Sequence, residues 1–159
     1  MLTTVPKSWF SWDFTVMDGA KPVGDIDISW WREKGVLTVE GVDYRVYRDG
    51  VMTGDFILAS DDAILARAKK PSAFRSAFIV NYADKQYTLR PTSIWGRAFA
   101  LLDRDTVVGT LSPRGIFTRR AAIDLPKTMP LSVRVFIIWL AVLIWKRESD
   151  AQGATTSGA

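Results

Sequence analysis

Residues 133–147 read VRVFIIWLAVLIWKR, and the eleven central positions of this stretch carry only apolar side chains. Pro130 suits the first turn of a helix, because the N–H that proline lacks is one that a first turn leaves unpaired. No Gly or Pro interrupts the residues that follow, and Lys146 and Arg147 stand where a helix C-terminus favours cations. The stretch therefore predicts a helix over residues 131–147.

This helix carries large apolar side chains on all of its sides, since every position from Phe136 to Leu140 has one. A helix that is apolar on all sides is enclosed by protein or lies in a bilayer. Eleven residues span about 16 Å of helix, whereas the hydrocarbon core of a membrane is about 30 Å thick. We expect a buried core helix that contributes Phe136, Trp139, Leu140 and Leu143 to the core. The alternative is a tail-anchored protein with residues 133–145 in the bilayer and a cytosolic β domain.

Short alternating runs separated by turn residues precede the helix. Examples are Trp9–Met17 and Ile116–Ile123, and Asp49-Gly50 is a strong hairpin signal. We count about eleven or twelve such strands. A helix with its side chains is about 10–12 Å across, and a barrel of about eleven strands can hold one. The order predicts a mainly β fold, a closed antiparallel barrel of about 12 strands around a central C-terminal helix. The small residues expected to face the helix are Ala66, Ala68, Ala98, Ala100 and Gly109.

The composition removes several chemistries. The chain has 159 residues, 48% hydrophobic and 24% charged, which fits one ordered domain. It lacks cysteine, which excludes disulfides and thiolate metal sites, and histidine, the commonest general base and metal ligand. No nucleophile with a nearby base and no Gly-rich phosphate loop is visible. We expect no enzymatic activity, no catalytic residue, no metal and no cofactor; acid pairs such as Asp25 and Asp27 are interpreted as solvated carboxylates.

The ends of the sequence bear on domain organisation and location. The small, polar residues 148–159 predict a disordered tail after a single domain over residues 1–147. The N-terminus has no long apolar segment after its lysine, so it does not resemble a secretory signal. We expect a cytoplasmic protein, peripheral at the cytosolic face of a membrane if it binds lipid. A closed barrel leaves no strand edge unpaired, so a monomer is expected.

Charge is distributed unevenly along the chain. The net charge is −5 over residues 1–63 and +11 over residues 64–147, and the whole chain carries +4. A basic segment favours anionic partners. The alternative interpretation is that the arginines solvate the outer faces of the strands and the two halves of the chain neutralise each other. The segment lacks a recognition helix or an aromatic RNA-binding strand, so nucleic acid is not expected.

The strand series of residues 37–113, with VGTL at residues 108–111, and the closing stretch LPKTMPLSVRVFIIWLAVLIWKR resemble the tubby-like superfamily. This superfamily comprises the tubby C-terminal domain, the LURP-one-related proteins and the phospholipid scramblases. The resemblance covers most of residues 20–147 and rests on pattern and order. It implies a twelve-stranded barrel closed around a C-terminal helix, and a non-enzymatic module that acts at membranes through phosphoinositides or other lipids. The acidic calcium loop and the palmitoylated cysteines of scramblases are absent from this sequence.

The best candidate site from the sequence is a group of cations on the strands between residues 63 and 102. Strand alternation places them opposite apolar residues, so they predict a basic outer patch for anionic lipid headgroups if the strands are neighbours. The six residues are Arg67, Lys69, Lys70, Arg75, Arg90 and Arg97.

Two adjacent pairs are secondary candidates. Arg119 and Arg120 cannot both point outward from a strand, which predicts that one of them is buried and paired, with Asp124 as the expected partner. Trp30-Trp31 puts one indole outside, where it would anchor at a membrane interface or pack under a loop.

Overall fold

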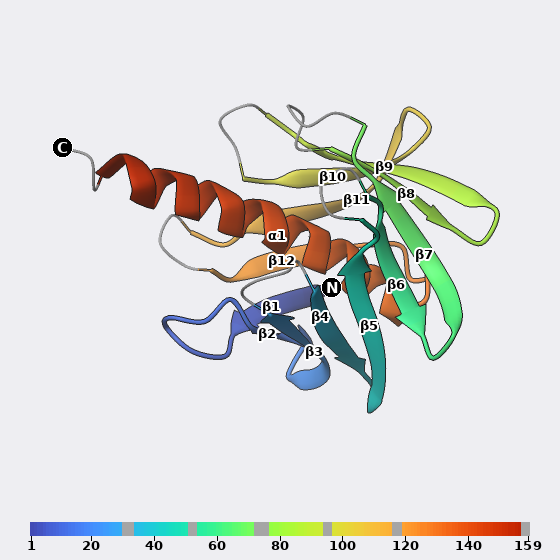
Figure 1. The fold of residues 1–159 in the computed structure, drawn as a ribbon, viewed down its shortest axis with the longest axis horizontal. Helices are drawn as coiled ribbons and strands as arrows, with labels where there is room; N and C mark the ends of the chain where they lie inside the picture. The colour runs from blue at the N-terminus through green and yellow to red at the C-terminus, as the bar shows by residue number, and fades with distance from the viewer. Residues whose placement is uncertain (30–33, 51–53, 72–76, 94–96, 116–118, 157–159) are drawn as a thin grey trace.

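The computed structural model describes the chain except residues 30–33, 51–53, 72–76, 94–96, 116–118 and 157–159 (Figure 1). The described residues form twelve strands followed by one helix. The strands are β1 (Leu2–Pro6), β2 (Phe14–Asp18), β3 (Lys21–Ser29), β4 (Lys34–Val39), β5 (Val42–Arg48), β6 (Phe56–Ser60), β7 (Ala63–Lys69), β8 (Phe78–Tyr82), β9 (Lys85–Pro91), β10 (Phe99–Asp103), β11 (Thr106–Pro113) and β12 (Ala121–Asp124), and the helix α1 is Leu131–Thr156.

Each strand pairs antiparallel with the strands before and after it, and β1 pairs with β12 to close the barrel. At this seam Leu2 lies opposite Ile123, and the backbone N–H of Ala121 donates to Oγ1 of Thr4 over 3.0 Å. Thr4 is fully buried, so this bond satisfies a hydroxyl that would otherwise be costly inside the protein. The predicted fold class, a closed twelve-stranded antiparallel barrel around a C-terminal helix, is confirmed.

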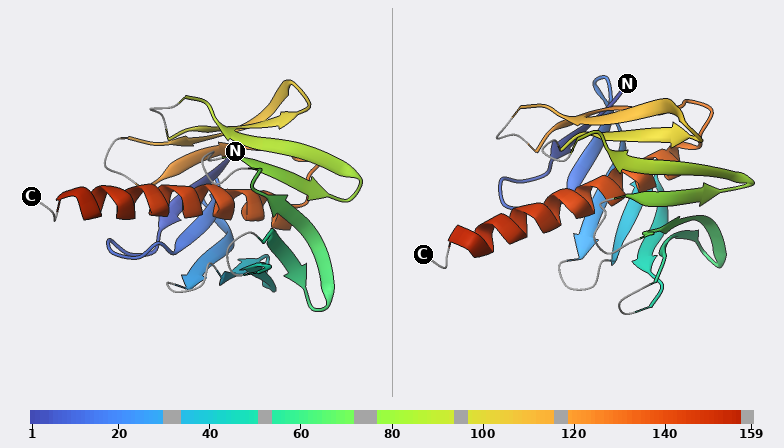
Figure 2. Two further views of the ribbon diagram at one scale, coloured as in Figure 1. Left: turned by 45° about the horizontal axis from the view of Figure 1, so that its top comes forward. Right: turned by 90° about the horizontal axis from the view of Figure 1, so that it is seen from above.

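The helix α1 supplies the centre of the core. Figure 2 shows it passing through the barrel and projecting beyond the strands at its C-terminal end. Every side chain from Val135 to Val142 is fully buried, and Leu143 and Trp145 are 4% and 2% exposed. A helix that is apolar on all sides is thus enclosed on all sides, which removes the whole of its apolar surface from water.

Aromatic residues fill the space between helix and barrel. The ring of Trp139 lies 5.7 Å from that of Phe56 on β6 and 5.8 Å from that of Phe136 one turn earlier in the helix. Phe56 in turn contacts Phe78 on β8 edge to face at 5.5 Å. Opposite these large rings, Ala66 and Ala68 on β7 face inward and are buried, as the sequence predicts. Large helix side chains thus meet small strand side chains on β7, which leaves room for the helix inside the barrel.

The two ends of the barrel differ in their connections. At one end, here called the turn end, five two-residue turns join even-numbered strands to the next odd-numbered ones. Each of these turns contains a residue with positive φ, which a primed hairpin turn requires. The residues are Gly19, Glu40, Asp61, Ala83 and Arg104, spaced 21 or 22 positions apart. At the other end, here called the loop end, connections of four to eight residues join odd-numbered strands to even-numbered ones, and α1 leaves the barrel.

Four of the loops at the loop end share one backbone design. In each, the first N–H of a seven-residue loop donates to the last carbonyl, for example from Lys7 to Asp13 over 2.9 Å and from Arg114 to Arg120 over 2.7 Å. The other two are residues 49–55 and 92–98. Fully buried or nearly buried phenylalanines follow three of these loops at positions 14, 56 and 99. The barrel is therefore built from regularly spaced hairpins, although the sequence alone shows only weak internal similarity.

Several predicted boundaries differ from the observed ones. The helix continues through Thr156, so the predicted end at residue 147 and the predicted disorder of residues 148–156 are not what the structure shows. The predicted strand Trp9–Met17 begins only at Phe14, because residues 7–13 form a loop. Ala100 lies on the outer face of β10, since its neighbours Phe99 and Leu101 belong to the core cluster.

Gly109 is buried where backbone segments approach closely. A Cβ at this position would lie 2.7 Å from the carbonyl oxygen of Asp124 and 2.9 Å from Cδ2 of Leu125. The connector from β12 to α1 passes here, so β11 needs a residue without a side chain.

Candidate functional site

Charge is separated along the axis of the barrel. Among the described residues, the two-residue turns and the strand residues that adjoin them carry seven acids and three bases. The described loops at the other end, counted in the same way, carry nine bases and three acids. The nine bases, which we call the basic end, are Lys7, Lys34, Arg48, Lys69, Lys70, Arg97, Arg114, Arg119 and Arg120. The loops at one end are thus rich in bases and the two-residue turns at the other are rich in acids, a distribution that can orient the protein at a charged surface.

The candidate cations predicted from the sequence lie on β7 to β10 and in the adjoining loops. Arg67 lies opposite Asn81 and Lys69 opposite Ile79, while Arg90 lies on the same outer face of β9. Strand pairing thus places these three on one outer surface of neighbouring strands. Arg67 and Asp55 form an exposed ion pair of 3.9 Å, which reduces the charge that Arg67 offers to a ligand.

Two of the remaining candidates, Lys70 and Arg97, lie on the rim of the barrel. Lys70 follows β7 directly, and Arg97 stands in the loop before β10. Arg75 lies outside the described residues, as does the Trp30-Trp31 pair. The predicted basic patch therefore continues from the outer face of the strands onto the loop end, where Lys69, Lys70 and Arg97 are members of the basic end.

A shallow hollow at the loop end lies where α1 leaves the barrel. Arg97, Arg119 and Arg120 line it together with the rings of Trp12, Phe14 and Trp145. The indole N–H of Trp145 donates to the carbonyl oxygen of Arg97 over 2.7 Å, which holds helix and loop together. Three guanidinium-bearing residues around aromatic rings form a setting in which a phosphate or carboxylate group would be attracted.

Arg119 connects two loops that are far apart in the sequence. Its guanidinium carbon lies 4.9 Å from the ring centroid of Trp12, and its Nη1 donates to the carbonyl oxygen of Ser11 over 2.6 Å. Among the interactions of the described residues, no pairing of Arg119 or Arg120 with Asp124 is found, so the expected partner was wrong. The reason is that both arginines belong to the loop before β12, where strand alternation does not apply.

The β1–β2 loop, residues 7–13, presents two large apolar side chains to solvent. Trp9 and Phe10 are each 84% exposed. The backbone beneath them is held by hydrogen bonds from the N–H of Ser11 to Oγ of Ser8, 3.1 Å, and from the N–H of Asp13 to Oγ of Ser11, 3.0 Å. The sequence pattern predicted a strand here, and these two aromatics were not among the candidate site residues. The signal that reveals the loop is the spacing of Ser8, Ser11 and Asp13, residue types that form local turns with the backbone.

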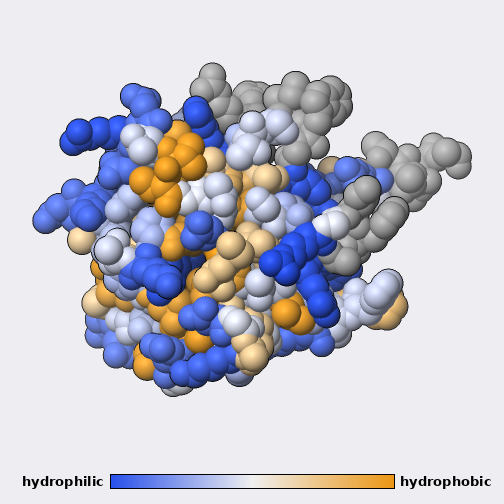
Figure 3. All heavy atoms as spheres, turned by 180° about the vertical axis from the view of Figure 1, so that it is seen from behind, coloured by the Kyte–Doolittle hydropathy of each residue, from blue (hydrophilic) through white to orange (hydrophobic). Residues whose placement is uncertain are grey.

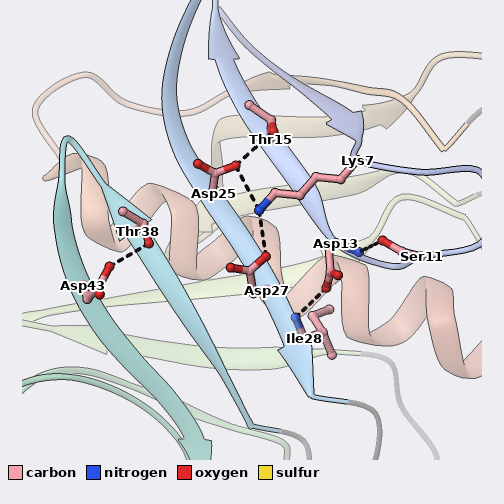
Figure 4. Close-up of polar contacts among 9 residues, drawn as sticks. All are labelled: Lys7, Ser11, Asp13, Thr15, Asp25, Asp27, Ile28, Thr38 and Asp43. Carbon is pink, nitrogen blue, oxygen red and sulfur yellow. Dashed lines mark hydrogen bonds and ion pairs between the residues drawn. The ribbon is translucent and has the colours of Figure 1, made fainter.

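Lys7, a member of the basic end at the start of this loop, has its charge compensated by two carboxylates (Figure 4). Its Nζ lies 2.7 Å from Oδ1 of Asp27 and 3.3 Å from Oδ1 of Asp25, and Asp25 also accepts from Oγ1 of Thr15 over 3.0 Å. Burial disfavours the charge of Lys7, but the hydrogen bonds that it donates to Asp27 and Asp25, together with the negative charges of these carboxylates, outweigh burial and raise the pKa of Lys7. Both acids serve to neutralise one lysine.

Other features of the described residues do not add a site. The described residues contain no group of three or more acidic side chains arranged to hold a metal ion. A cavity of about 170 Å³ opens near the N-terminus of α1, but Asp18 and Asp124 share its lining with Lys127 and Arg134, so it favours neither sign of charge. Seen from behind, the surface mixes hydrophilic residues with separate hydrophobic patches, and hydropathy alone singles out no binding face there (Figure 3).

The described part of the chain contains no helix with both the length and the apolarity needed to cross a membrane. No family model, no curated protein and no solved structure matches the chain.

Proposed function

We propose that this protein is a non-enzymatic binding module that associates with anionic membrane surfaces through the loop end of its barrel. The observation that carries the proposal is the separation of charge along the barrel axis, with nine bases and three acids in the described loops against three bases and seven acids at the turns. Such a distribution attracts a negatively charged surface to one end of the molecule and repels it from the other.

The arrangement of the cations suits a surface better than a small ligand. Most of them lie in loops that surround one end of the barrel, so several of them can approach a membrane at the same time, and Arg67 and Arg90 extend the basic surface along the outer face of β7 to β9. Each lysine or arginine near the surface of an anionic leaflet contributes about 1 kcal/mol, and this contribution falls off within about 10 Å at 0.1 M salt. Several such cations together supply useful affinity without a deep pocket.

The lipid class expected from the sequence, including phosphoinositides, stays part of the proposal. The hollow lined by Arg97, Arg119 and Arg120 has a volume of only about 10 Å³, so headgroup phosphates would meet these arginines at the surface of the loop end and not inside a pocket. A cytoplasmic protein that binds the cytosolic face of a membrane reversibly, as a monomer, is the form of the proposal that we favour.

The test is sedimentation of the full chain with vesicles of phosphatidylcholine alone and with 30% phosphatidylserine, at several salt concentrations. We expect binding to the anionic vesicles only, weakening as salt rises. Neutralising Arg67, Lys69 and Lys70 together with glutamine should weaken binding by about tenfold to a hundredfold, given about 1 kcal/mol per cation and the ion pair that already engages Arg67.

The matched control neutralises Lys21, Lys85 and Arg104, the three bases of the two-residue turns and the strand residues that adjoin them. Both variants lower the net charge by the same amount, so only the position of the charges differs. Equal loss of binding in the two variants, or no binding of the parent protein to anionic vesicles, would contradict the proposal.

A further inference from the structure

We infer that the β1–β2 loop inserts Trp9 and Phe10 into the headgroup region of the membrane that the basic end approaches. This inference rests on the proposed function and deepens it, because it names the residues that enter the lipid and the orientation of the barrel. The chemical class of the partner is the interface of an anionic phospholipid bilayer.

The first step is the exposure of these two side chains. Trp9 and Phe10 are each 84% exposed, more than any of the other large apolar residues that the structure shows at the surface, among which Met1 reaches 63% and Val107 55%. Transfer of two adjacent aromatic side chains from water to an apolar environment is favourable, so an apolar partner would stabilise this loop.

Hydrogen bonds within the loop, and one from Arg119, hold these two side chains in their exposed positions. The N–H of Lys7 donates to the carbonyl of Asp13, the two serine-mediated bonds described above span residues 8–13, and Arg119 donates to the carbonyl of Ser11. Trp12, the next aromatic residue, is only 8% exposed and lies under the Arg119 guanidinium. The loop therefore buries Trp12 at its base and exposes Trp9 and Phe10, and its internal hydrogen bonds reduce the ordering that binding would require.

The third step is the charge around the loop. Because β1 pairs with β12, the β1–β2 loop lies beside the described part of the loop before β12, which contains Arg114, Arg119 and Arg120. Tryptophan is enriched at the level of lipid headgroups, and arginines beside it meet the phosphates there. An apolar tip surrounded by cations is complementary to an anionic bilayer, which offers phosphates and an apolar interior side by side.

The same geometry predicts the orientation. The acidic turns lie at the far end of the barrel from this loop. Insertion of the loop would therefore bring the loop end toward the lipid with the barrel tilted, since the projecting part of α1 prevents it from standing upright on that end, and would direct the acidic turns away from the anionic surface.

The absence of cysteine from the sequence makes a direct test simple, because a single introduced cysteine is the only labelling site. Phe10→Cys in the full chain is labelled with an environment-sensitive fluorophore, and Val107→Cys, exposed beside a turn of the turn end, is the matched control. Both are mixed with vesicles containing 30% phosphatidylserine and a lipid that carries a quencher at the headgroup–acyl boundary. We expect a blue shift and strong quenching at position 10 and neither at position 107.

The outcomes separate the inference from the proposed function. Sedimentation with the vesicles but no shift or quenching at position 10 overturns the insertion and leaves the proposed function standing. No sedimentation with anionic vesicles overturns both. A shift at position 10 that appears with rising protein concentration and without vesicles shows a protein contact at the loop, which also overturns the insertion.

A second pair of variants tests the contribution to affinity. Trp9→Ser with Phe10→Ser should weaken binding to anionic vesicles by at least tenfold, and Ile64→Ser with Val107→Ser, two other exposed apolar positions, should leave it unchanged. Equal effects of the two double variants contradict the inference. Both leave the buried core intact, and unchanged thermal unfolding verifies that the variants are folded.

Discussion

Trp145 and Arg97 are joined by a hydrogen bond of 2.7 Å from the indole N–H to the backbone carbonyl oxygen. The bond ties the last buried turn of α1 to the loop before β10, at the point where the helix leaves the barrel. Trp139, one of the largest fully buried residues, differs in this respect, since its indole Nε1 has no hydrogen-bond partner among the described residues. The two tryptophans of this helix therefore differ in free energy of burial, because only Trp145 compensates its buried indole N–H with a hydrogen bond among the described residues.

This difference predicts unequal effects of the same substitution. Trp145→Phe loses volume and a hydrogen bond and leaves the Arg97 carbonyl without its donor, whereas Trp139→Phe loses similar volume but removes an unpaired N–H. We expect Trp145→Phe to lower the free energy of unfolding by about 1–3 kcal/mol more than Trp139→Phe does. Urea unfolding of the two variants measures the difference, and a larger loss for Trp139→Phe would show that packing at position 139 dominates instead.

Trp139→Arg tests the role of the helix. A charge at a fully buried position with aromatic neighbours Phe56 and Phe136 should cost several kcal/mol and unfold the barrel, as seen by loss of the near-ultraviolet circular dichroism signal. The tail-anchored alternative predicts the reverse. In that case the β domain stays folded and the protein moves from an alkaline-resistant membrane pellet to the soluble fraction.

Gly109→Ala should destabilise the barrel because of the close approach at that position. A Cβ there would lie 2.7 Å from the Asp124 carbonyl oxygen and 2.9 Å from Leu125, so strand and connector must move apart, with an expected cost of about 1–3 kcal/mol. The control is Gly153→Ala in the projecting part of α1, where a Cβ meets nothing within 4 Å. We expect this variant to be as stable as the parent protein or slightly more so. Chemical denaturation of both gives the comparison, and equal midpoints would show that the contact at residue 109 relaxes without cost.

The ion pairs of Lys7 predict that the stability of the fold decreases at alkaline pH. Its pKa is raised above the ordinary value of 10.5 in the folded protein, where Asp27 and Asp25 accept its hydrogen bonds. The folded state therefore binds this proton more tightly than the unfolded state, so the stabilisation is complete below pH 10.5 and is lost as the pH rises through the folded pKa.

Lys7→Met should reduce the fall in melting temperature above this pH. Lys85→Met, at an exposed lysine of the turn end, is the control and should leave the alkaline slope unchanged. Identical slopes for the parent and Lys7→Met would show that the ion pair in the folded state adds no stability.

The candidate site was predictable only in part. Alternation along β7 correctly places Arg67 and Lys69 on the outer face opposite Ala66 and Ala68, because side-chain direction in a regular strand follows from position alone. The same rule was applied to Arg119 and Arg120 and was wrong, because they lie in a loop. The exposed pair Trp9-Phe10 was assigned to a strand for the same reason. Apolar alternation does not distinguish a strand from a loop that buries one of its aromatic residues and exposes others.

By itself, the sequence determined that one helix ends the chain and that a β barrel surrounds it. The physical reason is local: an uninterrupted apolar run of eleven residues needs apolar partners on every side, and only the preceding strands can supply them. Only the tertiary structure decided where the charges gather. Antiparallel pairing sends every second connection to the same end, so bases from loops up to about a hundred residues apart collect there, and the pairing of β1 with β12 brings Arg119 to the loop that presents Trp9 and Phe10.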